Sequence, residues 1–176
     1  VDAHHAALRQ AWLAGAVVVT PEPAHHALLA DKRNLVRLSD PDLLASFGAA
    51  DETIATLASI PRAQIVDAAN AAALWADRKN LFFKPWAGHG GKAVYRGDKL
   101  TRGTWAQILE GGYIAQELAP PGERLVLIDD RPEPRKVDVR LYTYSGAPLL
   151  TAARIYQGQT TNFRTEGGGF APVFFA

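Results

Sequence analysis

Two lysines flank a glycine-rich segment that could bind phosphate. An apolar run containing Lys84 leads into Gly88-His89-Gly90-Gly91, and Lys92 follows before a second strand-like run at 93–95. Glycines allow backbone N–H groups to approach an anion closely, and a flanking ammonium adds the charge that amides lack. The pattern predicts a polyphosphate-binding loop within a β-loop-β hairpin. A tight hairpin with two solvated lysines fits the same residues about equally well.

Two better-known glycine loops do not fit this segment. Residues 88–93 satisfy the loose dinucleotide pattern, but that pattern requires a helix directly after the loop, whereas Ala93-Val94-Tyr95 predicts a strand. A Walker P-loop requires Ser or Thr after its lysine, and Ala93 follows Lys92.

Composition restricts the classes of function. A chain of 176 residues with 48% apolar residues and a net charge of +1 predicts one compact domain or two small lobes. The balanced charge predicts no nucleic-acid partner, although it leaves room for local basic patches. The lack of cysteine excludes disulfides, thiolate metal sites and a cysteine nucleophile. No segment approaches the ~20 apolar residues of a membrane span, so we expect no membrane partner and a cytoplasmic location.

Two histidine pairs, His4-His5 and His25-His26, could suggest a metal site. Adjacent residues on a helix point about 100° apart and seldom share one ion. We therefore interpret them as solvated side chains and predict no metal ligand in the chain.

Periodicity predicts the elements that position the glycine loop. We expect helices over 3–14, 23–39, 42–47, 52–59 and 67–78, a buried strand over 16–20 and an extended segment over 61–66. After the loop, Thr101 or Thr104 should cap a helix that ends at Gly111-Gly112, and a strand should span 113–118.

The C-terminal third predicts a hairpin that carries charge. Residues 129–136 contain charges and prolines and predict a loop, while 137–143 and 148–156 predict strands joined by a turn at Ser145-Gly146. Alternation puts Asp138 and Arg140 on one face of the first strand, and the second strand carries Arg154. Two arginines on paired strands predict a nearby anion.

The order and spacing of these segments resemble the ATP-grasp enzymes, and among them the circularly permuted branch similar to glutathionylspermidine synthase. The resemblance extends from about residue 16 to the last residue. The matching segments are Ala30–Leu35, Arg78–Gly91, Tyr113–Leu118, Asp138–Arg140, Arg154, Asn162 and Gly167–Gly169. It implies an α+β, two-lobed fold with antiparallel sheets and packed helices: a lead-in over 1–39, a first lobe over 40–117 and a partial second lobe over 118–176.

The resemblance implies binding roles for ATP. Lys32 and Lys84 correspond to the two nucleotide lysines of the family. The residues that would cover the β- and γ-phosphates are Gly88, His89, Gly90 and Gly91. Those that correspond to the hinge beside the adenine are Gln116, Glu117 and Leu118, with Leu118 and Phe83 as candidate apolar walls.

The resemblance also implies catalytic roles in the second lobe. Asp138, Arg140 and Arg154 would face the transferred phosphate, where arginine stabilises developing charge. Asn162 and the Gly167–Gly169 run correspond to the loop near the triphosphate and the acceptor carboxylate.

In the family, ATP phosphorylates a carboxylate, and an amine or another nucleophile such as a thiol attacks the acyl phosphate. Mg²⁺ bridges the phosphates and is usually held by an Asp and a Glu-x-Asn pair, which this sequence lacks. In the permuted branch those residues would precede Val1. We therefore expect an incomplete fragment that is inactive alone, binds ATP weakly or not at all, and self-associates through an open sheet edge and apolar surface that includes Phe170, Phe174 and Phe175.

Two other functions fit the same residues. One is a non-catalytic nucleotide-binding or regulatory module on the same fold. The other is an interaction domain whose glycine loops are only turns.

Overall fold

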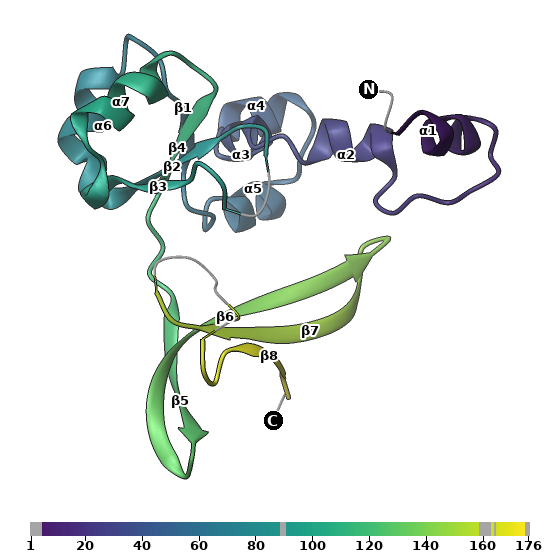
Figure 1. Ribbon diagram of the computed structural model, residues 1–176. Helices are drawn as coiled ribbons and strands as arrows, with labels where there is room; N and C mark the ends of the chain where they lie inside the picture. The colour runs from purple at the N-terminus through teal and green to yellow at the C-terminus, as the bar shows by residue number, and fades with distance from the viewer. Residues whose placement is uncertain (1–4, 89–90, 159–162, 164, 175–176) are drawn as a thin grey trace. The chain divides into compact units, whose positions relative to one another are not determined.

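The chain forms two compact units, residues 1–117 and 118–176, in a computed structural model that describes residues 5–88, 91–158, 163 and 165–174 (Figure 1). Each unit contains a four-stranded antiparallel sheet, and the helices belong to the first unit, which confirms the expected α+β class. The structure groups 1–39 with 40–117 in one unit. No helix in the described part of the chain is long and apolar enough to cross a bilayer.

The first unit contains most of the predicted helices. They are α1 (Ala6–Leu13), α2 (Pro23–Leu29), α3 (Arg33–Leu38), α4 (Pro41–Ser46), α5 (Asp51–Leu57), α6 (Ala71–Asp77) and α7 (Arg102–Leu109), with the short 3₁₀ turns η2 (Arg78–Asn80) and η3 (Gly97–Lys99). Side-chain caps explain several starts. Asp40 accepts a hydrogen bond from the Leu43 N–H, and Thr101 accepts one from the Thr104 N–H, as predicted for α7.

The sheet of the first unit holds the predicted β-loop-β hairpin. Its strands are β1 (Ala63–Ile65), β2 (Leu81–Pro85), β3 (Tyr95–Arg96) and β4 (Tyr113–Glu117), in the order β1-β4-β2-β3. β2 and β3 pair antiparallel across the glycine loop, and β4 pairs with both β1 and β2. This confirms the strands predicted at 61–66 and 113–118.

The hydrophobic core lies between this sheet and the helices α6 and α7 (Figure 1). Phe83 is completely buried there and packs edge-on against Trp105, with ring centroids 5.3 Å apart. Because strand side chains alternate, Phe82, Lys84 and Gln116 point to the opposite face of the sheet. That second face carries the candidate site.

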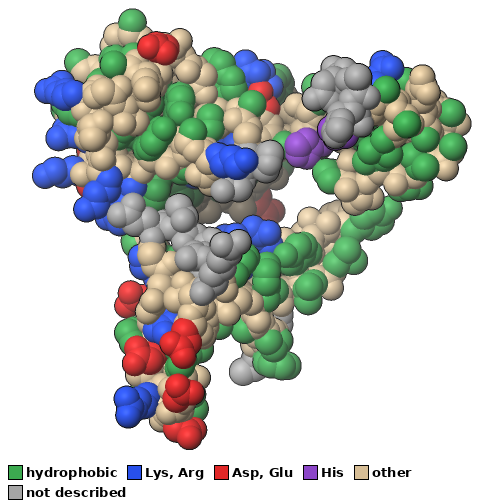
Figure 2. All heavy atoms as spheres, viewed as in Figure 1, with side chains coloured by type: hydrophobic (Ala, Val, Ile, Leu, Met, Phe, Trp, Pro, Cys, Tyr) green, Lys and Arg blue, Asp and Glu red, His purple; other side chains and the backbone are tan. Residues whose placement is uncertain are grey.

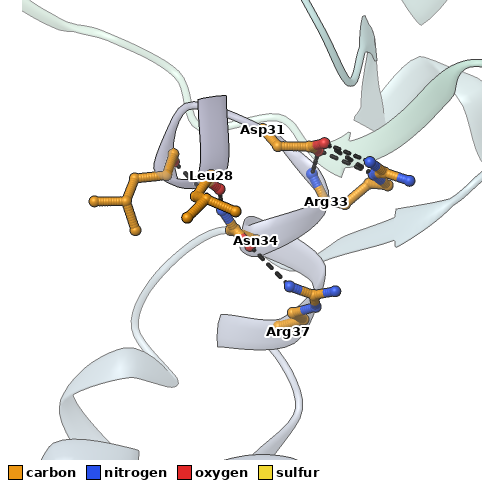
Figure 3. Close-up of polar contacts among 6 residues, drawn as sticks. Leu28, Asp31, Arg33, Asn34 and Arg37 are labelled. Atoms are coloured by element: carbon orange, nitrogen blue, oxygen red, sulfur yellow. Dashed lines mark hydrogen bonds and ion pairs between the residues drawn. The ribbon is translucent and has the colours of Figure 1, made fainter. Parts of the chain in front are cut away.

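The single helix predicted over 23–39 is wrong, because the chain breaks into α2 and α3. The Asp31 carboxylate accepts the Arg33 backbone N–H at 2.8 Å, which competes with helical hydrogen bonding and starts a new helix (Figure 3). Asn34 donates from its side chain to the carbonyl of Leu28 at 2.8 Å and so satisfies the end of α2.

The buried strand predicted over 16–20 is also wrong. This segment is irregular, and Val18 is 94% exposed. It has no pairing partner among the described strands, so its β-branched residues fail to form a ladder.

The second unit is a meander of four strands. These are β5 (Gly122–Ile128), β6 (Arg131–Tyr144), β7 (Ala147–Tyr156) and β8 (Gly169–Pro172), in sequential order. Ser145 and Gly146 both have positive φ, 49° and 80°, as the two-residue turn of a hairpin requires. The predicted strands at 137–143 and 148–156 and the turn between them are confirmed.

The loop predicted over 129–136 is wrong, because only Asp129 and Asp130 form a turn and β6 begins at Arg131. Pro132 and Pro134 lie within the pairing of β6 with β5. β6 pairs with β7 only from Lys136 onward, so at the prolines one side of β6 has no partner strand. Proline is tolerated at such an edge because no N–H is needed there.

The sheet of the second unit exposes many apolar side chains, as expected. Phe170 is 57% exposed and Phe174 is 86% exposed, while Phe175 lies outside the described residues. Val139 and Leu141, on one face of β6, are also exposed.

Candidate nucleotide-binding site

A direct hydrogen bond joins Lys84 on β2 to Gln116 on β4. Antiparallel register pairs Phe82 with Gln116 and Lys84 with Ile114, which places both polar side chains on the face away from the core. The Lys84 Nζ donates to Gln116 Oε1 at 2.7 Å, and Gln116 Nε2 donates to the Pro61 carbonyl at 3.0 Å. Gln116 is buried, so both ends of its amide are fixed.

Lys32 reaches the same end of β2 from the turn between α2 and α3. Its backbone N–H donates to the Trp86 carbonyl at 2.9 Å, and its Nζ donates to the Gly88 carbonyl at 2.9 Å. Trp86 is held in turn by its own N–H, which donates to the Gly112 carbonyl. The structure therefore brings the two predicted nucleotide lysines together beside the start of the glycine loop.

The residues around Lys32 form a clasp that we define as Asp31, Arg33 and Trp86. Both carboxylate oxygens of Asp31 accept from the Arg33 guanidinium, the shortest distance being 2.6 Å (Figure 3). This guanidinium lowers the pKa of Asp31 to about 2. The Arg33 Cζ lies 4.8 Å from the centroid of the Trp86 ring, a cation–π contact. The clasp thus fixes the turn that carries Lys32.

The electrostatics of the two lysines favour an anion. Burial lowers the pKa of Lys84, and the nearby Lys32 ammonium lowers it further. Among the described residues, no carboxylate lies within ion-pair distance of either lysine. A bound phosphate would relieve this repulsion and give both ammonium groups a charged acceptor.

The glycine loop, in its described part, has positive backbone φ angles that glycine adopts readily. Gly88 has φ of 122° and Gly91 has φ of 71°, both in the region that other residues rarely adopt. His89 and Gly90 lie outside the described residues. Lys92 is exposed.

The predicted hinge residues have different surroundings. The Glu117 carboxylate accepts the Arg62 N–H at 2.9 Å, so it fastens β4 to the segment before β1. Leu118 is half-buried and begins the second unit. The prediction of Phe83 as an adenine wall is wrong, because this side chain is in the core on the other face of the sheet. Phe82 lies on the face of Lys84, whose Nζ is 5.8 Å from the ring centroid.

In the second unit, Arg154 already has a carboxylate partner. Its Nε and Nη2 donate to the two oxygens of Asp138 at 2.6 and 2.8 Å across the β6–β7 pair. The hydrogen bonds that Arg154 donates to Asp138 raise the pKa of Arg154. Burial raises the pKa of Tyr156, on the same face, and Asp138 raises it further. The sequence predicted an anion near the two arginines, and for Arg154 the Asp138 carboxylate is such an anion.

Arg140 presents its guanidinium to solvent. It is exposed and lies 5.9 Å from the Tyr142 ring centroid. Asn162 lies outside the described residues. In the Gly167–Gly169 run, Gly169 begins β8, and a Cβ at Gly167 would come within 2.4 Å of the Ile128 side chain. The positive φ of Gly167, 66°, also favours glycine at this position.

Three contributors to the site were not predicted from the sequence. Phe82 and Trp86 were hidden by a strand register that depends on β4, although Trp86 follows Pro85 directly at the loop entrance. The pairing of Asp31 with Arg33 was not predicted either. The described residues contain no group of three His, Asp or Glu side chains arranged to hold a metal.

Comparison of the chain with protein-family models and with curated proteins found no match. The assignment of a function therefore depends on the residues and the geometry given above.

Proposed function

We propose that this chain is the ATP-binding portion of an ATP-dependent carboxylate–amine or carboxylate–thiol ligase with an ATP-grasp fold, which acts through an acyl phosphate. The observation that carries the proposal is the position of Lys84. Its ammonium is held by Gln116, lies near enough to the Lys32 ammonium to be perturbed by it, and stands at the entrance of a glycine loop.

The chemistry of this face matches a nucleotide phosphate. Two ammonium groups without a described carboxylate partner supply charge, and the loop at Gly88 and Gly91 supplies backbone that can approach closely. The half-buried Phe82 offers an apolar surface beside them for a base. Adenine would contact this surface and the hinge at Gln116, Glu117 and Leu118.

Mg²⁺ is part of the proposed reaction but receives no ligand here. The described residues do not offer the carboxylate group that would hold it, so we derive no step through the metal. The proposal assigns the chain itself the binding and orientation of the nucleotide.

The second unit carries two arginines whose guanidinium groups could bind phosphate. Arg140 has an exposed guanidinium suited to bidentate contact with a phosphoryl group. Arg154 is oriented by Asp138, which fixes the plane of its guanidinium.

A second candidate is a nucleotide-binding module without catalysis. The observation that favours it is the bidentate pairing of Arg154, whose guanidinium would have to leave or share Asp138 in order to stabilise a transferred phosphoryl group. In this case the first unit would bind nucleotide as above, and the Asp138–Arg154 pair would only stabilise the sheet.

Isothermal titration calorimetry with MgATP and MgADP tests nucleotide binding. We expect Lys84→Ala to weaken binding at least tenfold, because a charged hydrogen-bond donor to phosphate is lost. The matched control is Lys99→Ala, an exposed lysine on η3, which should bind like the parent chain. Equal affinity of both variants for millimolar nucleotide would refute the nucleotide site, whereas absence of binding to the parent chain would show that these residues alone do not form it.

Hydroxylamine separates a ligase from a binding module. The described residues hold no metal site, so the test adds a longer polypeptide that supplies the Asp and Glu-x-Asn ligands. Incubated with MgATP and a pool of carboxylic acids, a ligase then forms an acyl phosphate and ADP. Hydroxylamine then attacks the acyl carbon, releases phosphate and leaves a hydroxamate. Hydroxamate that depends on Lys84 supports the ligase, whereas nucleotide binding without hydroxamate supports the module.

A further inference from the structure

The ring of Trp75 on α6 is contacted by two guanidinium groups. The Arg78 Cζ lies 4.2 Å from the ring centroid, and the Arg102 Cζ lies 4.3 Å from it. Each guanidinium gains from the electron-rich face of an indole, which holds a planar cation in a fixed orientation. Trp75 lies on α6, Arg78 on η2 and Arg102 on α7, on the core side of the sheet. None of them belongs to the Lys84 site.

Tight backbone packing holds the segment that carries Arg78 in place. Arg78 belongs to η2, which packs on η3, and a Cβ at Gly97 of η3 would come within 1.8 Å of the Arg78 carbonyl oxygen. The Arg78 Nη1 also donates to the Trp75 carbonyl at 2.7 Å. The Arg78 guanidinium is therefore fixed by its hydrogen bond to the backbone, and both guanidinium groups contact the Trp75 ring.

The surface around Trp75 carries an excess of positive charge. We define the basic surface as Arg78, Lys79, Lys99 and Arg102. Figure 2 shows Lys and Arg side chains gathered along the edge of the first unit where Figure 1 labels α6, α7 and β3.

The nearby carboxylates do not neutralise this surface. Asp98 forms an ion pair with Arg96, and Asp77 accepts a hydrogen bond from Asn80. The four basic residues and Asp77 together have a net charge of +3. No member of the basic surface has an ion-pair partner within the described ranges. The chain as a whole has a net charge of only +1.

We propose that the basic surface binds the phosphate backbone of a nucleic acid without reading its sequence. Fixed guanidinium groups match phosphate oxygens in two-point contacts, and lysines add charge at the edges. A protein partner would call for an apolar centre, but the Trp75 ring is already in contact with two cations. The balanced net charge gave no indication of this partner, because the charge is local.

Fluorescence anisotropy with a labelled oligothymidine and a duplex of equal length tests the proposal. The full chain should bind both at about 50 mM salt, with affinity falling steeply up to about 200 mM, because cations are released from the phosphates. The combined variant Lys79→Gln, Lys99→Gln and Arg102→Gln should bind at least tenfold more weakly and show a smaller salt dependence. Arg78 is left unchanged because its guanidinium also bonds the backbone.

Two controls make the outcome decisive. Arg124→Gln removes an exposed arginine of the second unit and should leave binding unchanged. No binding at low salt, or equal loss in the Arg124 variant, would overturn the proposal. If a polyglutamate of similar charge binds equally well, the partner is an acidic protein and the nucleic-acid proposal is wrong.

Discussion

Lys84 and Gln116 are neighbours on adjacent strands, and the lysine ammonium donates to the glutamine carbonyl oxygen at 2.7 Å while the glutamine amide donates onward to Pro61. Gln116 is neutral, so the hydrogen bond leaves the positive charge of Lys84 unpaired. Gln116 fixes the direction of the ammonium without neutralising it, and this is the arrangement that a site for an incoming anion requires.

Gln116→Ala should destabilise the first unit. The substitution leaves the Pro61 carbonyl and the Lys84 ammonium without their partner in a buried position, which costs about 1 to 3 kcal/mol in the free energy of unfolding. Urea unfolding followed by circular dichroism measures the change. Gln107→Ala, on the exposed side of α7, is the matched control and should stay within about 0.5 kcal/mol. Equal effects would show that the Gln116 network adds nothing to stability.

Lys84 should make the stability of the chain depend on alkaline pH. Its pKa is lower in the folded chain than in the unfolded chain, so between those values the unfolded chain holds more protons. The free energy of unfolding should therefore rise with pH through the window that ends near the ordinary lysine value of 10.5, and Lys84→Met should remove this component. Denaturation at several pH values checks the slope, and a slope unchanged in the variant would contradict it.

Lys32→Met should raise the pKa of Lys84 only partway toward its ordinary value. The variant removes the repulsion from the second ammonium, but burial, the larger cause, remains. Titration of the lysine ε-carbons by NMR measures the shift, with Lys84→Met identifying the signal and Lys99→Met as the control. MgADP should raise the same pKa in the parent chain, because phosphate favours the charged form.

Gly97→Ala should be strongly destabilising, because the new Cβ would meet the Arg78 carbonyl oxygen at 1.8 Å. Either η2 or η3 must move, at a cost of roughly 1 to 3 kcal/mol. Gly103→Ala offers the matched control, since its Cβ would meet only the Thr101 hydroxyl at 4.0 Å and alanine favours a helix. Thermal unfolding of both variants decides the matter, and a Gly97 variant as stable as the Gly103 variant would show that the packing is loose.

Local signals in the sequence were sufficient for the elements that carry the site. Thr101 predicts the start of α7, and the glycines predict the hairpin that β2 and β3 form. The errors arise where distant partners decide. Val18 has the residue type of a strand but no neighbour to pair with, and Pro132 sits in β6 because β7 does not reach that position. Phe82 and Phe83 are adjacent in sequence, and only the register with β4 determines which of them faces Lys84.

The residues predicted to bind nucleotide illustrate the same distinction. The resemblance to ATP-grasp enzymes pointed to Lys32 and Lys84, and the hydrogen bonds to Gly88 and Gln116 place them at one end of β2. Residue type also pointed to Arg154, but charge pairing across strands is not visible in a linear sequence. Asp138 lies 16 residues earlier and accepts both of its hydrogen bonds.

Asp138→Asn should lower the pKa of Tyr156 and release Arg154. The pKa of this hydroxyl is raised by burial first and by Asp138 second, so removal of the charge should bring it closer to 10.0 while burial keeps it above that value. Ultraviolet difference absorption of tyrosinate measures the shift, with Tyr156→Phe identifying the signal and Asp129→Asn, in the β5–β6 turn, as the control. An unchanged pKa would show that Asp138 does not act on Tyr156.

The same variant tests the role of Arg154. If Arg154 only stabilises the sheet, the affinity of Asp138→Asn for nucleotide should stay constant while its unfolding midpoint falls. If Arg154 contacts phosphate, freeing it from Asp138 should change the affinity for MgATP more than the affinity for adenosine, which has no phosphate to contact.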